Sequence, residues 1–255
     1  AASWESDGAG EIYERSRSGY PPALIDVLAG EVGLGPLSVV GDVAAGTGKL
    51  TRLLLPVVAA VVAIEPAEGM RRQLRRAAPG ARAVAATAEH LPLADGVLDA
   101  VTVAQAFHWF RPTEALAEFA RVVRPGGALA LIWNLDDPVL DAGPEAPPNA
   151  VSVELKATCD RFERLRPRPR VQWRRSLEGA EGWGPPHEVR LDGSETLTVE
   201  MLVDRVASRS FALLLDDPDR MALLAEIERI GRRAAAPDGR VTLPTATVMF
   251  WMRRL

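Results

Sequence analysis

The sequence predicts an α/β fold in which helices cover both faces of a largely parallel sheet. Apolar, β-branched runs alternate with helical stretches from about residue 21 to residue 134, as in repeated strand–helix–strand units. The first such strand is continuously apolar except for Gly41 and Asp42, as expected of a strand buried on both faces. A chain of 255 residues, 47% hydrophobic and 25% charged, can form one large domain or two small ones.

Turn and cap residues delimit the elements of this first part. Gly33 follows the first expected helix, Pro66 ends the second strand, and Pro112 stands in the first turn of the last helix. The pair Pro79-Gly80 stops an arginine-rich amphipathic helix. We expect helices over residues 20–32, 48–58, 67–78 and 112–123, and strands over residues 37–44, 60–64, 81–86, 98–104 and 128–133.

The pattern changes after Asn134. Residues 136–150 are rich in proline, aspartate and glycine, which predicts a loop. Helices are expected over residues 151–165, 199–208 and 219–234, and strands over 188–191 and 241–253, the last with a break near Pro244. We therefore expect one domain in four parts: an N-terminal helical segment (1–35), a core (36–135), an inserted, mostly helical cap (136–187), and C-terminal helices with two final strands that return to the same sheet (188–255).

Composition and charge narrow the functional classes. The net charge of −4 does not fit a dedicated nucleic-acid binder, which usually carries a basic face. The longest apolar run, residues 53–64, is shorter than the roughly 20 residues of a bilayer span. Cys159 is the only cysteine, so an internal disulfide is excluded, and the three scattered histidines give no metal-binding spacing. With no secretory signal pattern, these features predict a cytoplasmic protein without a bound metal.

Nearly all basic residues of the chain are arginines. Lys49 and Lys156 are the only lysines, which we interpret as GC-rich codon usage. Arginines are concentrated between residues 161 and 175, and prolines interrupt this run. We interpret it as a solvated surface, with contact to a carboxylate substrate, a phosphate substrate or a nucleic acid as the alternative.

The turn between the first strand and the following helix carries the strongest functional signal. Residues 39–51 are Val-Val-Gly-Asp-Val-Ala-Ala-Gly-Thr-Gly-Lys-Leu-Thr, and glycines at such a turn let the backbone approach a ligand at a helix N-terminus. Glu65 follows 19 residues after Gly46, at the end of the second strand. A carboxylate there can accept hydrogen bonds from both ribose hydroxyls, so the two features together predict an adenosine cofactor.

Two other nucleotide-binding motifs do not fit this turn. A P-loop requires Ser or Thr after the Gly48-Lys49 pair, where the chain has Leu50, and a glycine where it has Val43. A dinucleotide fingerprint that begins at Gly46 needs a third glycine where the chain has Thr51. What remains is the pattern Asp-x-Ala-x-Gly-Thr-Gly.

At these residues the sequence resembles the class I S-adenosylmethionine-dependent methyltransferases. It is most similar to their small-molecule group, with trans-aconitate and quinone-biosynthesis methyltransferase-like proteins. Asp42, Gly46 and Gly48 match the acidic residue and the last two glycines of the family's first motif, and Ala44 replaces its first glycine. The resemblance implies a Rossmann-like, doubly wound sheet of seven strands with an antiparallel last strand. It also implies S-adenosyl-L-methionine as the cofactor and S-adenosyl-L-homocysteine as its product.

The resemblance also implies a set of cofactor contacts. It is strong over about residues 13–134 and loose over residues 188–255. Residues 13–21 resemble the segment that folds over the cofactor in this group, Glu65 matches the ribose-binding acid, and Thr87 stands where the family often has Asp beside the adenine. The expected cofactor contacts are Arg17, Tyr20, Asp42, Ala44, Gly46, Gly48, Glu65, Pro66, Met70, Thr87, Ala88, Glu89 and Gln105.

His108 is the expected catalytic base. It follows the fourth strand at the carboxyl edge of the sheet, where ligands of open α/β sheets bind, and imidazole accepts a proton near neutral pH. The alternative is that His108 orients a loop or contacts the cofactor. Phe107, Trp109 and Arg209 are the expected substrate contacts.

The resemblance implies transfer of a methyl group to a small-molecule acceptor by in-line displacement. Oxygen is the expected acceptor atom, with carbon and nitrogen as alternatives. An NAD(P)-dependent oxidoreductase and a non-catalytic cofactor-binding protein of the same fold are the competing hypotheses. A nucleic-acid methyltransferase is disfavoured by the acidic net charge. The sequence makes no prediction of the acceptor's identity or of the oligomeric state.

Overall fold

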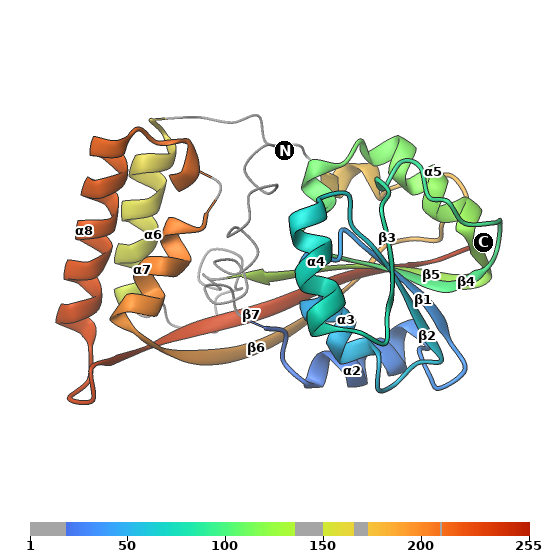
Figure 1. Ribbon diagram of the computed structural model, residues 1–255, viewed down its shortest axis with the longest axis horizontal. Helices are drawn as coiled ribbons and strands as arrows, with labels where there is room; N and C mark the ends of the chain where they lie inside the picture. The colour runs from blue at the N-terminus through green and yellow to red at the C-terminus, as the bar shows by residue number, and fades with distance from the viewer. Residues whose placement is uncertain (1–18, 136–149, 166–172, 210) are drawn as a thin grey trace.

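The computed structural model describes residues 19–135, 150–165, 173–209 and 211–255. The part of the expected N-terminal segment that precedes residue 19 lies outside these residues. Seven strands form one sheet in the order β3-β2-β1-β4-β5-β7-β6 (Figure 1). Strands β1 to β5 run parallel, whereas β7 runs antiparallel to both of its neighbours. This confirms the predicted Rossmann-like sheet. The strands are β1 (Val39–Val43), β2 (Ala60–Ile64), β3 (Arg82–Val84), β4 (Leu98–Ala104), β5 (Val123–Leu135), β6 (His187–Thr198) and β7 (Arg240–Arg253).

Helices cover both faces of the sheet, as predicted. Within β5, Leu131 packs into a core with Phe119 on one face, and Ile132 packs with Leu24 and Leu54 on the other. All five side chains are at most 1% exposed, which explains why the strand sequences are continuously apolar. The helices are α2 (Ala23–Val27), which continues as the π-helical η2 (Leu28–Val32), α3 (Lys49–Leu54), α4 (Glu68–Ala77), the 3₁₀ helix η3 (Phe107–Trp109) and α5 (Pro112–Val122).

Strands β6 and β7 form a long antiparallel pair, from His187 opposite Trp251 to Thr198 opposite Arg240. The strand expected over residues 188–191 is therefore much longer, because backbone pairing with β7 extends it through a polar stretch. The predicted break near Pro244 is wrong. Pairing between β5 and β7 stops at Ala246, so the edge of β7 that faces β5 is open at the proline and its missing N–H costs no hydrogen bond to β5.

The far ends of β6 and β7 carry a helical lobe (Figure 1). Its core contains Leu155, Leu202 and Ile227, one from each long helix. The expected boundary at residue 187 does not follow this packing, since the lobe takes helices from both sides of it. We call this lobe the cap, and define it by α6 (Ala150–Glu163), α7 (Val199–Ala207), the 3₁₀ helix η5 (Ala212–Leu214) and α8 (Asp217–Ala234).

The segment from Trp173 to Trp183 does not belong to the cap, although it falls within the insertion expected over residues 136–187. Trp173, in the 3₁₀ helix η4 (Trp173–Ser176), stacks on Trp133 of β5 with ring centroids 4.1 Å apart. Trp183 donates a hydrogen bond from Nε1 to the carbonyl oxygen of Leu116, at 3.1 Å. This segment therefore covers the sheet next to α5.

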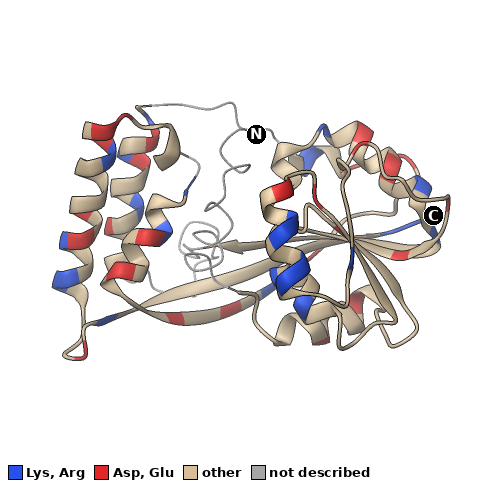
Figure 2. Ribbon diagram, in the orientation of Figure 1, with Lys and Arg blue, Asp and Glu red and all other residues tan. Residues whose placement is uncertain are grey.

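Charged residues lie mainly on the helices, and most of the sheet is uncharged (Figure 2). On α8, Arg232 pairs with Glu228 one turn earlier, at 2.6 Å. No helix in the described parts of the chain combines the length and the apolarity that a bilayer span requires.

Candidate functional site

A cavity of about 480 Å³ lies where β1 and β4 end, between the sheet and the cap. Its sheet side is formed by the turn after β1, the residues after β4 and the end of β5. Its cap side is formed by α6, α7 and the residues that follow α7. The volume is within the range of small-molecule sites, and the position at the carboxyl edge of the parallel strands is where such folds bind ligands.

The turn after β1 combines left-handed backbone with close helix packing. Ala44, Gly46 and Gly48 have φ angles of 55°, 58° and 87°. Ala44 and Gly46 line the cavity, as expected of cofactor contacts. Gly48 does not line it. A Cβ atom there would make an ordinary contact with the side chain of Leu74, 3.4 Å away, so it is the positive φ angle that favours glycine where α3 begins.

Glu65 is joined directly to this turn. Its Oε2 accepts a hydrogen bond from the backbone N–H of Gly46 at 3.0 Å, and its Oε1 accepts one from Ala67 at 2.9 Å. The residue is 7% exposed. Burial raises the pKa of this carboxyl above its usual value, and the two backbone hydrogen bonds oppose that rise. The structure therefore brings the glycine turn and this carboxylate together, and their contact with an adenosine cofactor stays a prediction.

Asp42 is a buried carboxylate in the cavity wall. Its Oδ2 accepts a hydrogen bond from Thr51 Oγ1 at 2.6 Å, and its Oδ1 accepts one from Thr102 Oγ1 at 3.1 Å. Burial raises the pKa of Asp42 to about 6, with a smaller contribution from the charge of Glu65, while the two hydroxyl donors lower it. Asp42 thus ties β1 to α3 and β4 at the floor of the site.

The residues after β4 reach the cavity as predicted, except for one. Gln105, His108 and Trp109 line it, and Trp109 is 60% exposed. The rings of His108 and Trp109 lie 5.0 Å apart. The expected role of Phe107 as a substrate contact is wrong. Its side chain is fully buried, and its ring packs edge-on against Phe110 in the core beside α5. In a 3₁₀ helix successive side chains point about 120° apart, so Phe107 faces the core while His108 and Trp109 border the cavity.

The residues expected beside the adenine lie around the ends of β2 and β3, outside the lining of this cavity. Met70 and Ala88 are buried, whereas Pro66 and Thr87 are exposed. Glu89 accepts a hydrogen bond from the backbone N–H of Arg111 at 3.0 Å. Their contact with adenine stays a prediction.

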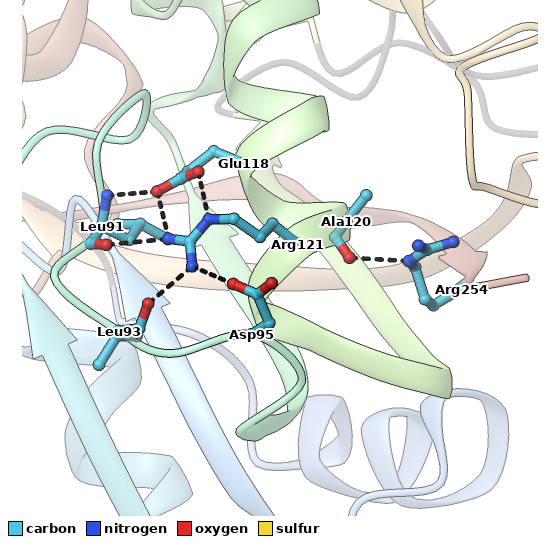
Figure 3. A network of polar contacts seen from close by, with 7 residues as sticks. All are labelled: Leu91, Leu93, Asp95, Glu118, Ala120, Arg121 and Arg254. Carbon is cyan, nitrogen blue, oxygen red and sulfur yellow. Dashed lines mark hydrogen bonds and ion pairs between the residues drawn. The ribbon is translucent and has the colours of Figure 1, made fainter.

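The loop before β4 is anchored by Arg121 of α5 (Figure 3). The guanidinium donates to the carbonyl oxygens of Leu91 at 3.0 Å and Leu93 at 2.8 Å. It also pairs with the carboxylates of Asp95 at 2.7 Å and Glu118 at 2.6 Å. This network ties the loop to α5 and holds the stretch expected beside the adenine against the sheet.

Asn134, at the end of β5, is a site residue that sequence reasoning missed. Its Nδ2 donates to the carbonyl oxygen of Gly19 at 2.9 Å, and its Oδ1 accepts from Thr247 Oγ1 at 2.7 Å. Its own carbonyl oxygen accepts from Gln105 Nε2 at 3.1 Å. Asn134 thus joins β5 and β7 to the segment carrying Tyr20, which lines the cavity. Arg17 lies outside the described residues.

The cap residues of the cavity were missed as a group, apart from Arg209, which lines it as expected. Their signal is helical spacing, since lining residues recur every three or four positions along α6 and α7. Lys49 and Lys156 both line the cavity, so the only two lysines of the chain meet at one site.

Comparison with known proteins gives a consistent answer. A family model described as "Methyltransferase domain" matches residues 41–131. An uncharacterized methyltransferase of Mycobacterium tuberculosis is 36% identical over 238 residues, which cover 92% of this chain and 90% of that protein. A malonyl-[acyl-carrier protein] O-methyltransferase of Methylococcus capsulatus is 43% identical over 111 residues, 41% of this chain and 40% of that protein. The structure of a proposed type II methyltransferase from Anaeromyxobacter dehalogenans is 25% identical, with a TM-score of 0.67 over 93% of this chain and 97% of that chain.

The chain therefore belongs to the class I S-adenosylmethionine-dependent methyltransferases. This agrees with the failure of the dinucleotide fingerprint and decides against the NAD(P)-dependent oxidoreductase.

Proposed function

We propose that this methyltransferase transfers a methyl group to an oxygen atom of a small molecule bound between the glycine turn and the cap. The observation that carries the proposal is that one cavity is lined by both regions and also by His108. Its volume of about 480 Å³ is of small-molecule size. The name of the Methylococcus capsulatus relative, an O-methyltransferase, supports oxygen as the acceptor atom.

The residues of the sheet side fit the cofactor. A Cβ atom built on Gly46 would meet nothing within 4 Å, so the turn presents open backbone, and its N–H is already oriented by Glu65. Each carboxylate oxygen of Glu65 accepts one backbone hydrogen bond in the structure and has a further lone pair for a ribose hydroxyl. Tyr20, Asp42 and Gln105 border the same space. When bound, S-adenosylmethionine supplies a methyl group activated by a positively charged sulfur.

His108 is the proposed base. It accepts the proton that an acceptor hydroxyl loses as the oxygen becomes a nucleophile, since imidazole titrates near neutral pH. Leu135, Leu155 and Leu243 line the same cavity and exclude water from it. The sheet and the cap together hold the acceptor oxygen in line, and such positioning supplies about 7–11 kcal/mol in favourable systems.

The cofactor half is tested with Glu65→Gln. Replacing the carboxylate with an amide weakens its hydrogen bonds to the ribose, so the affinity for S-adenosylhomocysteine should fall by about 10-fold or more. The measurement is isothermal titration. Glu68→Gln is the matched control, because Glu68 lies three residues further on and is exposed, pairing with Arg71. Equal affinities of the two variants for S-adenosylhomocysteine would show that Glu65 does not bind the cofactor.

The catalytic half is tested by screening small hydroxyl, carboxyl, amine and carbon acceptors for release of S-adenosylhomocysteine. With the best acceptor, His108→Asn should lower kcat by about 10²–10⁴-fold and abolish the pH dependence near neutrality. His187→Asn is the control, because His187 is exposed on β6 and stacks on Trp251. Transfer to nitrogen or carbon alone would refute oxygen, and an unchanged pH profile would refute His108 as the base.

A further inference from the structure

The cap side of the cavity carries polar groups that the proposed reaction does not use. On α6, Lys156, Asp160 and Glu163 face the cavity at helical spacing. Arg205, in the last turn of α7, and Arg209, just after that helix, line it from the other side of the cap. Lys156 pairs with Asp160 on the same helix, and the two cap helices thus direct charge into one space beside largely apolar neighbours.

Ser152 is the first indication of a ligand. It lies in the first turn of α6, lines the cavity and is only 3% exposed. Its Oγ is buried and has no hydrogen-bond partner. A buried hydroxyl without a partner costs free energy, and native structures rarely keep one. The first turn of a helix also favours a negative charge, because its backbone N–H groups carry a partial positive charge.

Arg205 is the second indication. It is 4% exposed although it carries a charge, and its guanidinium pairs with Glu195 of β6 at 2.9 Å. Glu195 is 29% exposed and approaches from the strand beneath α7, so it fixes the orientation of the guanidinium. A guanidinium has five N–H donors in a rigid fork and can bind one carboxylate of the protein and another of a ligand.

The charged groups around the cavity limit the charge that such a ligand carries. The described lining residues include four cationic side chains and three carboxylates, and Glu195, which pairs with Arg205, offsets the remaining positive charge. Because these formal charges balance, a single negative charge, as on a carboxylate, disturbs them less than a phosphate dianion does. The rest of the cap side is apolar, with Leu155, Leu202, Val206 and Phe211 in the lining.

We propose that the acceptor carries a carboxylate on an apolar body, and that the cap binds this carboxylate through Ser152, Arg205 and Arg209. The carboxylate serves as an anchor and is distinct from the oxygen that receives the methyl group. This inference rests on the proposed function, because it assigns the substrate class of the same cavity.

The test measures binding and needs no turnover. Protein saturated with S-adenosylhomocysteine is titrated with straight-chain monocarboxylates from butanoate to dodecanoate, and with the primary amide of each. The amide has the same shape and no charge. For the best chain length, the acid should bind at least about 10-fold more tightly than the amide, because hydrogen bonds to charged groups are the stronger ones.

Two variants locate the anchor. Ser152→Ala and Arg209→Gln should each weaken binding of the best acid by about 10-fold and leave binding of its amide unchanged. Arg232→Gln is the matched control, because it removes the same charge from the cap at an exposed position paired with Glu228. It should leave both affinities unchanged.

Several outcomes would overturn the inference. These are equal affinity for acid and amide at every chain length, no binding of any acid, or no effect of either variant on acid binding. Tighter binding of an alkyl phosphate of matched length would overturn the choice of a carboxylate. Failure of the proposed function would look different: the acids would bind as expected, but no acceptor oxygen would be methylated.

Discussion

The sheet and the cap contribute to one cavity in different ways. On the sheet side, one short stretch at the end of β1 and in the turn that follows it contributes Asp42, Ala44 and Gly46, and the residues after β4 and the end of β5 complete the wall. The cap side is built from residues spread along α6 and α7, between which 35 residues of chain intervene, from 164 to 198. The difference teaches that the glycine turn is a local motif of the chain, whereas the cap side of the cavity depends on how the faces of two helices are brought together.

The largest expected effect concerns two phenylalanines, one in each region. Phe107→Ala should lower the free energy of unfolding by about 3–5 kcal/mol, because Phe107 is fully buried beside α5. Phe211→Ala should lower both the stability and the affinity for an acceptor, since Phe211 packs in the cap and lines the cavity. Urea unfolding and ligand titration check both.

Phe107→Leu is a milder change, and it is the variant to measure if the alanine variant does not fold. It should lower stability and leave ligand affinity unchanged. A variant with unchanged stability and altered acceptor affinity would instead show that Phe107 contacts the acceptor.

The second prediction contrasts the buried charges of the two regions. Arg205 in the cap pairs with a carboxylate, whereas Asp42 accepts hydrogen bonds from the hydroxyls of Thr51 and Thr102, and burial raises the pKa of Asp42 to about 6. Because the folded state holds this proton more tightly than the unfolded state, the stability contributed by protonated Asp42 is present below about pH 4. It is lost as the pH rises through 6.

The effect is measured against Asp42→Asn, which cannot titrate. From pH 4 to pH 7, the unfolding free energy of the natural protein should fall by about 2.5 kcal/mol relative to that of the variant. Urea unfolding at several pH values checks this. Parallel curves for the two proteins would show that Asp42 has an ordinary pKa.

The smallest effect concerns backbone strain, which the described chain stores only on the sheet side. Ala44 and Gln105 are its non-glycine residues with positive φ, at 55° and 61°. Ala44→Gly should raise the free energy of unfolding by up to about 1 kcal/mol, because glycine adopts this conformation without a Cβ clash.

Gln105→Gly is the comparison, since it relieves the same strain but removes the hydrogen bond to Asn134. It should gain less stability than Ala44→Gly. A loss of stability in Ala44→Gly, seen by urea unfolding, would mean that the lower entropy of alanine in the unfolded chain outweighs the strain.

The predictions made from the sequence agree with the structure where an element is encoded locally, and they fail where it depends on contacts between distant segments. The strands predicted over residues 60–64 and 98–104 are β2 and β4 with the same ends, because β-branched runs between turn residues carry a strong local signal. Residues 192–198 have no such alternation, and only pairing with β7 makes them a strand. Phe107 was misplaced because the sequence cannot tell which way a side chain points in a short 3₁₀ turn.

The sequence by itself determined the fold class, the glycine turn and the position of Glu65 directly after β2. Each of these follows from local patterns, that is, from residues close together in the chain. Only the tertiary structure decided that Asn134 joins three segments, that both lysines face one cavity, and that Ser152 and Arg205 border the same space. The physical reason is that contacts between distant segments depend on how whole elements pack, and helical periodicity shows that a face is directed inward but not what it meets there.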